Sequence, residues 1–122
     1  MAVGPAASNA NAFLEELDAM WIQLHTGDPG AAGTSNVAGN STRKQISLGS
    51  ASGGSISNDA DISWSPEDVD TSEDYTHFSL WSASTSGTFL WSGTITANAV
   101  TAGDEFEIGS GDLTISLSPV AA

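Results

Sequence analysis

The sequence predicts a mainly β fold: a single antiparallel β-sandwich or jelly-roll-like domain with one short α-helix near its N-terminus. Three observations predict it. Apolar and polar residues alternate with a period of two in several short segments, breakers rich in Gly and Ser separate these segments, and one segment alone has helical spacing. Many short strands with turn signals between them are typical of sandwiches and barrels. A chain of 122 residues has the length of one domain, so we take residues 1–122 as a single domain.

Residues 8–20 have the spacing of an amphipathic helix of about three turns. The apolar side chains recur three and four positions apart and form one face: Phe13, Leu14, Leu17, Met20 and the following Trp21. Glu15, Glu16 and Asp18 lie on the other side, which we interpret as a solvated face. Ser8 or Asn9 is the expected N-cap, because a side-chain oxygen at that position accepts a hydrogen bond from a free backbone N–H of the first turn.

The period changes to two at Trp21, where the predicted β domain of residues 21–118 begins. Ile22 and Leu24 share one face of the first strand, and Gln23 and His25 share the other. A long polar loop follows at 28–41. Six further strands are predicted between Gly- and Ser-rich breakers, at 43–48, 61–65, 76–82, 88–96, 105–108 and 112–118.

The charge of the chain excludes several classes of partner. Fifteen Asp and Glu stand against Arg43 and Lys44 alone, which gives a formal net charge of −13. Such a field repels nucleic acid and anionic membrane surfaces, and no apolar run approaches the roughly 20 residues of a membrane span. We therefore predict neither a nucleic-acid partner nor membrane insertion. The same negative charge opposes folding through self-repulsion, and salt screens this repulsion. The composition therefore favours a halophilic protein over an ordinary acidic one.

Little in the sequence indicates catalysis or a bound cofactor. Cys is absent, and the only imidazoles, His25 and His77, lack the spacing of zinc ligands. No Ser lies in a G-x-S-x-G turn. We therefore predict no enzymatic activity and no cofactor.

The acidic stretch at 67–74 contains the one weak candidate for a metal site. Hard cations take several carboxylate oxygens, so Asp68, Asp70 and Asp74 are candidate calcium ligands. The stretch lacks the Gly and the distal Glu of an EF-hand loop. The competing interpretation is a solvated acidic loop.

Three tryptophans are candidates for either the core or a contact surface. Trp64, Trp81 and Trp91 each lie in or beside a predicted strand. Aromatic side chains of small β domains usually pack in the core, and those on the surface mark subunit interfaces or stack on sugars. All three are retained as candidate interface residues.

Several short motifs, in this order, resemble a family of short virion proteins of tailed phages. The motifs are W-I-Q-L-H-T-G-D-P-G at 21–30, S-L-G-S-A-S-G-G-S-I-S-N at 47–58, T-H-F-S-L-W-S-A at 76–83, L-W-S-G-T-I at 90–95 and V-T-A-G-D at 100–104. Members of this family are commonly labelled tail fibre or minor tail proteins. The resemblance covers about 13–117. The acidic stretch at 67–74 and the scarcity of Lys and Arg depart from the family pattern and fit a virus of a salt-loving, haloarchaeal-like host.

The resemblance implies a structural protein of a tailed virus particle, present in many copies on the capsid or tail as a decorating or fibre-like component. It would be made in the host cytoplasm and act in the virion. Its implied partners are other virion proteins, copies of itself and a host surface glycan or receptor. The alternative is a carbohydrate- or receptor-binding β-sandwich in which exposed Trp side chains stack on sugars.

The long loop leads to an expectation about assembly. Residues 28–41 and the end of the chain from 118 to 122 contain few apolar side chains to offset the entropy of ordering them. We therefore expect a homo-oligomer, or a lattice on a partner shell, in which the loop or residues 1–11 lie at a subunit contact.

Overall fold

The computed structural model describes residues 3–117, and within them the side chains of all residues except 96–98. One helix, α1 (Ala7–Glu15), precedes eight strands. The strands are β1 (Trp21–His25), β2 (Lys44–Gln45), β3 (Ser55–Ser57), β4 (Ile62–Trp64), β5 (Glu73–Trp81), β6 (Phe89–Val100), β7 (Phe106–Ile108) and β8 (Thr114–Ser116). Every pair of strands is antiparallel. The predicted class, mainly β with antiparallel sheets and one short helix near the N-terminus, is confirmed.

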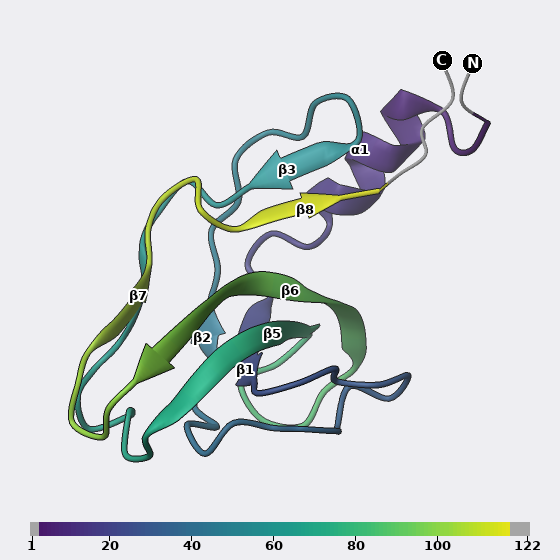
Figure 1. Ribbon diagram of the computed structural model, residues 1–122. Helices are drawn as coiled ribbons and strands as arrows, with labels where there is room; N and C mark the ends of the chain where they lie inside the picture. Colours follow the sequence, from purple (N-terminus) through teal and green to yellow (C-terminus); the bar gives the residue numbers. More distant parts are fainter. Residues whose placement is uncertain (1–2, 118–122) are drawn as a thin grey trace.

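The strands form three sheets, which are arranged as Figure 1 shows. The largest has four strands in the order β2-β1-β5-β6, and two smaller sheets pair β3 with β8 and β4 with β7. The long pair β5–β6 runs from Glu73 opposite Val100 to Trp81 opposite Phe89. Helix α1 packs against β3, so the helix and the β3–β8 pair form one end of the molecule and the four-stranded sheet forms the other.

The helix is shorter than the sequence predicts, and its N-cap is different. It ends at Glu15 rather than at residue 20, and Ala6 occupies the N-cap with no side-chain hydrogen bond. The next residues form tight turns, and Ala19 adopts a left-handed conformation with φ of 63°. The Asp18 carboxylate accepts hydrogen bonds from the N–H groups of Ala19 and Leu48, which gives those groups a partner outside a helix.

The bounds of three strands differ from the prediction, because they depend on pairing with another strand rather than on the local sequence pattern. The predicted strand 43–48 is reduced to two paired residues, although the Ile46 N–H still donates to the Met20 carbonyl. Strand β3 was not predicted, because three residues between glycines show too little alternation to detect. Strand β6 extends past the predicted end at 96 to Val100, since β5 continues alongside it as far as Glu73.

The hydrophobic core joins all three sheets and the end of the helix. Leu14 and Leu17 contribute from the helical region, and Trp64 and Phe106 pair across the β4–β7 sheet with ring centroids 5.5 Å apart. Tyr75 of β5 meets Phe106 edge-on at 4.8 Å. These aromatic contacts fix the β4–β7 pair against the four-stranded sheet.

The loop at 28–41 is ordered by contacts within its own chain. The Gly39 and Asn40 N–H groups donate to the Glu73 carboxylate over 2.8 and 3.0 Å. Gly33 has a φ of +72°, and a Cβ there would collide with the Phe89 ring. The argument that neighbouring subunits must supply the ordering energy of this loop is therefore wrong, because hydrogen bonds and close packing within the chain supply it.

Candidate functional site

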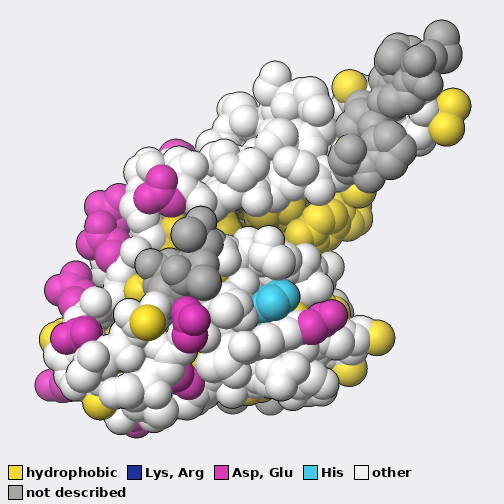
Figure 2. Space-filling view, in the orientation of Figure 1, with side chains coloured by type: hydrophobic (Ala, Val, Ile, Leu, Met, Phe, Trp, Pro, Cys, Tyr) yellow, Lys and Arg dark blue, Asp and Glu magenta, His cyan; other side chains and the backbone are white. Residues whose placement is uncertain are grey.

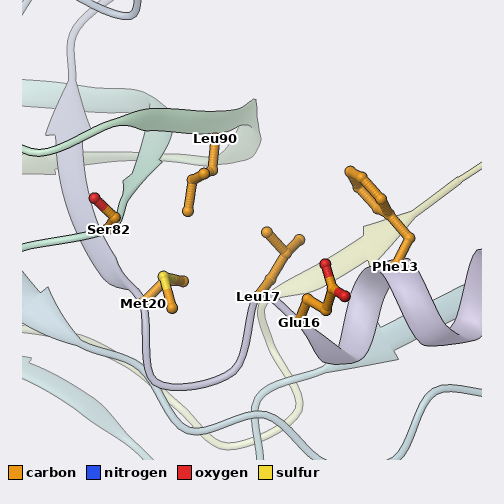
Figure 3. Close-up of a pocket in the computed structure, with 6 residues that line it drawn as sticks. All are labelled: Phe13, Glu16, Leu17, Met20, Ser82 and Leu90. Carbon is orange, nitrogen blue, oxygen red and sulfur yellow. The ribbon is translucent and has the colours of Figure 1, made fainter.

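An apolar pocket lies between the helical region and the start of β6. Its volume is about 270 Å³, and its lining residues are Phe13, Glu16, Leu17, Met20, Ser82 and Leu90. Leu90 descends from β6 toward Met20 and Leu17, and Phe13 flanks them from α1 (Figure 3). Phe13 belongs to the predicted apolar face of the helix, but 46% of it is exposed. The helix buries Leu14 and the turn after it buries Leu17, which leaves the Phe13 ring at the mouth of the pocket.

Strand β6 forms an edge of the four-stranded sheet beside this pocket. Over residues 3–117 it pairs with β5 on one side and with no strand on the other. It is 12 residues long. An edge of this kind leaves every second N–H and C=O free to pair with another strand.

Arg43, just before β2, extends across one face of the sheet, over β1 and the end of β5. Its guanidinium donates to the Gln23 side chain at 3.1 Å and to the carbonyls of Ala83 and Ser86 at 2.9 and 2.7 Å. The guanidinium carbon lies 4.3 Å from the centre of the Trp81 ring. Burial lowers the pKa of Arg43 from its usual value. The Arg43 guanidinium is therefore bound by three hydrogen-bond acceptors and by the face of an aromatic ring.

Lys44, the second cation, forms an ion pair with Asp68. The Lys44 Nζ lies 3.1 Å from the Asp68 carboxylate. Burial acts to raise the pKa of Asp68, but the hydrogen bonds from Lys44 and the Ser65 N–H, together with the lysine charge, hold that pKa below its usual value. Both cations of the chain therefore have partners within it, and Figure 2 shows a face with several Asp and Glu side chains and no visible Lys or Arg.

His25 lies at the centre of a buried polar network, on the face of the sheet that carries Gln23 and Arg43. Its Nδ1–H donates to the Ser35 carbonyl at 2.9 Å, so its Nε2 accepts from the Ser79 hydroxyl at 2.7 Å. The Trp81 indole N–H donates to the same hydroxyl at 2.7 Å. Burial lowers the pKa of His25, although its backbone hydrogen bonds act in the other direction. Gln23 and His25 share the face of β1 opposite Ile22 and Leu24, and both side chains are buried.

The neutral imidazole of His25 fits this network, since one nitrogen must donate and the other must accept. His77 lies opposite His25 in the pairing of β1 with β5, and its Nδ1 contacts the Thr76 hydroxyl at 2.8 Å. His25 is occupied on both nitrogens, so the pair does not form the start of a metal site.

The structure separates the three candidate tryptophans. Trp64 is fully buried and donates its indole N–H to the Thr42 carbonyl at 2.8 Å, and Trp81 is 8% exposed beneath Arg43. As candidate interface residues these two are corrected to core residues. Trp91 on β6 is half-buried and packs on Phe13, with ring centroids 6.0 Å apart.

The candidate calcium ligands are not brought together. Asp68 pairs with Lys44, the Asp70 carboxylate accepts from the Thr71 hydroxyl at 3.1 Å, and Asp74 lies in β5 opposite Ala99. Across residues 3–117 no three His, Cys, Asp or Glu side chains gather in a way that fits a metal ion. The carboxylates of Asp68 and Asp70 have separate partners and Asp74 lies on β5, so the structure does not gather the three candidates, and calcium binding here stays a prediction.

Many carboxylates instead accept hydrogen bonds from backbone N–H groups of turns and loops. This role is shared by Glu15, Asp18, Asp28, Asp61, Asp68, Glu73 and Asp104. Such charge-assisted bonds satisfy donors that strands and helices leave free. The acidic composition is therefore built partly into the turns of the fold.

Comparison with protein families identifies the chain. The sequence model of the family described as "Podophage GP4 fiber I protein gp80" matches residues 8–116. The chain belongs to this family. The match runs from α1 to the end of β8, so it includes the pocket, the β6 edge and the buried network. A search of curated proteins gave no match.

Membership of this fibre family confirms the predicted resemblance to fibre-type virion proteins of phages. It identifies the chain as a protein of the virion fibre type and implies association with other virion components. No helix within residues 3–117 is long and apolar enough to cross a membrane.

The pocket and the open edge were not among the sequence-predicted site residues. The signal for them is an absence of charge: residues 75–103 contain no Asp, Glu, Lys or Arg. This is the longest such run in the chain, and β6 lies inside it.

Proposed function

We propose that the chain is a non-enzymatic structural protein of a tailed virus particle, present in many copies as a fibre-like or decorating component of the tail or capsid surface. The observation that carries this proposal is the match to a phage fibre family over residues 8–116. The proposed partners are other virion proteins and copies of the chain itself.

The buried polar groups support a structural role over a catalytic one. Ser79 and His25 form a hydroxyl–imidazole pair, which in other settings is a nucleophile and its base. Both are fully buried, and the Ser79 oxygen already accepts from the Trp81 indole. A substrate has no route to this hydroxyl, so the pair serves to join β1 to β5.

The sugar-binding alternative is less well supported. It requires tryptophans in a row on a free surface, whereas Trp64 and Trp81 are buried. Trp91 alone of the three keeps substantial exposed surface, and it shares that surface with Phe13. Recognition of a host receptor therefore remains a secondary proposal.

Immunogold electron microscopy of purified particles tests the proposed location. Antibodies against the purified chain should label regularly spaced positions on the tail or capsid of intact virions. Labelling confined to host debris would contradict a virion role.

The loop at 28–41 is retained as a proposed contact with other virion proteins. Deleting it would disrupt the fold, given the packing of Gly33 on Phe89. Val37→Asp is a milder change, because Val37 is 40% exposed. We expect this variant to fold normally and to enter particles less efficiently, and Thr85→Asp, at an exposed position outside this loop, is the control. Incorporation of Val37→Asp at the wild-type level would show that the loop makes no such contact.

We also propose that the protein is adapted to high salt. Because a formal net charge of −13 makes the folded chain repel itself, screening by salt should raise the melting temperature between low salt and molar NaCl. A melting temperature that is equal or lower in molar NaCl would contradict the proposal. Comparing chloride with sulfate separates screening from general salting-out.

A further inference from the structure

We propose that a second copy of this chain binds along β6 by adding an uncharged extended segment to its open edge. We call this region the β6 surface: the free edge of Phe89–Val100 together with the adjoining pocket of Phe13, Leu17, Met20 and Leu90. The inference deepens the proposed assembly role by assigning its contact surface, and it rests on that role for its place in the particle.

The strand lacks several of the features that protect natural edges. Protein edges are usually short, charged with Lys, interrupted by Pro or a bulge, or covered by another element. The sequence F-L-W-S-G-T-I-T-A-N-A-V of β6 contains no charged residue and no Pro, and within residues 3–117 it is the longest strand at 12 residues. Its pairing with β5 shifts register twice, and Trp91–Thr94 between these shifts pairs regularly. This regular, uncharged part of the edge is a template for strand addition.

Apolar side chains beside the edge give the added segment something to pack on. The pocket is lined mostly by apolar groups, and Phe13 and the half-buried Trp91 meet at its side. Hydrophobic side chains gather between the helical end of the molecule and the part below it in Figure 2. Backbone hydrogen bonds along β6 and side-chain burial in the pocket would together supply affinity and register.

The charge distribution indicates that the occupant is another copy. β6 itself carries no carboxylate to draw a cationic partner, and Glu16 is the charged residue of the adjoining pocket. Two copies repel each other wherever acidic residues face one another, and neither copy offers an unpaired Arg43 or Lys44 to offset this repulsion. Along the uncharged run at 75–103 two copies can approach with few opposing carboxylates, provided that Glu16 of each copy lies at the rim of the contact.

Matched charge substitutions on the two edges of the sheet test the proposal on the purified full chain. Thr94 on β6 and Gln45 on β2 both have exposed side chains, and each gains one negative charge on substitution by Glu. Gln45 also donates to the Ala19 carbonyl at 3.0 Å, so melting curves check that both variants remain folded. We expect the wild type to self-associate in molar NaCl by analytical ultracentrifugation. Thr94→Glu should weaken this association about tenfold or more, while Gln45→Glu leaves it within about twofold.

Photo-crosslinking provides a second measurement that requires no change of charge. Benzoylphenylalanine at position 13 replaces one exposed aromatic side chain by another and should give a covalent dimer, whereas the same group at position 45 should not. A monomeric wild type at millimolar concentration in molar NaCl would overturn the inference. Equal effects of the two Glu substitutions, or equal crosslinking from both positions, would also overturn it. Normal labelling of particles together with any of these results would leave the virion role intact and refute the β6 contact alone.

Discussion

The two edges of the four-stranded sheet differ in length and charge. The β2 edge consists of two residues, and beside it Arg43 lies across the face of β1 and β5, where its guanidinium bonds to three acceptors and covers Trp81. The β6 edge is six times as long, carries no charge and pairs with nothing on its outer side within residues 3–117. Both cations of the chain lie beside the β2 end of the sheet, and the β6 edge is uncharged. The difference separates a side of the sheet that is held by polar contacts within the chain from the side that we propose for contact with a second copy.

Arg43→Ala should have the largest effect on this comparison. It removes four stabilising contacts and leaves the buried Gln23 side chain and two carbonyls without their donor. We expect a loss of about 3 kcal/mol in the free energy of unfolding, measured by urea denaturation. Arg43→Lys keeps the charge but lacks the planar fork, so it should recover only part of the loss. Full recovery by Lys would show that the positive charge alone accounts for the stabilisation.

His25 should make the same side of the sheet sensitive to acid. Its pKa is lower in the folded chain than in the unfolded one, so its contribution to stability is complete above the ordinary pKa of about 6.5 and declines as the pH falls toward the folded value. The slope is at most about 1.4 kcal/mol per pH unit for one proton. His25→Gln should lower stability at neutral pH and flatten this slope. Parallel pH profiles for the two proteins would show that another group causes the loss.

Lys44→Ala should have the smallest effect. The Lys44–Asp68 pair is partly exposed, with side-chain exposures of 34% and 21%, and pairs of this kind contribute about 0–1 kcal/mol. Because the pair lowers the pKa of Asp68, its contribution exists above the unfolded pKa of about 3.9 and is lost as the pH falls through the folded value. Urea denaturation at neutral pH and at pH 3 should show a small difference between wild type and variant that shrinks in acid. A loss as large as that of Arg43→Ala would mean that positive charge, rather than the geometry of the Arg43 contacts, determines the stability on this side of the sheet.

The sequence predicted those parts of the fold that depend on local pattern. Alternation of side chains located seven of the eight strands, and helical spacing placed the helix near the N-terminus. It did not locate Ser55–Ser57, whose three residues become a strand only through pairing with Thr114–Ser116, 59 positions later in the chain by the first residue of each. The continuation of β6 to Val100 likewise depends on β5.

The site could be predicted less well, because burial and pairing depend on the whole fold. The alternation at 21–25 correctly separates Ile22 from Gln23 but cannot show that Arg43 and the 28–41 loop cover the polar face. The acidic residues at 67–74 are close in sequence, yet their carboxylates have different partners. Asp68 pairs with Lys44, and Glu73 accepts a hydrogen bond from the backbone of the 28–41 loop. β6 has a free edge because it is the last strand in the order of the sheet, and the sequence cannot show this order. The only local signal is the absence of charged residues.

The arrangement of the two cations also determines how proteases act on this protein. Arg43 and Lys44 are adjacent, and each side chain is held by partners in the folded chain, so trypsin should leave the native protein intact. After denaturation it can release only residues 1–43 and 45–122 as long peptides. A tryptic survey of particle proteins would therefore record this chain poorly however many copies are present. Cleavage after Glu, which occurs in both halves of the chain, yields the shorter fragments that counting requires.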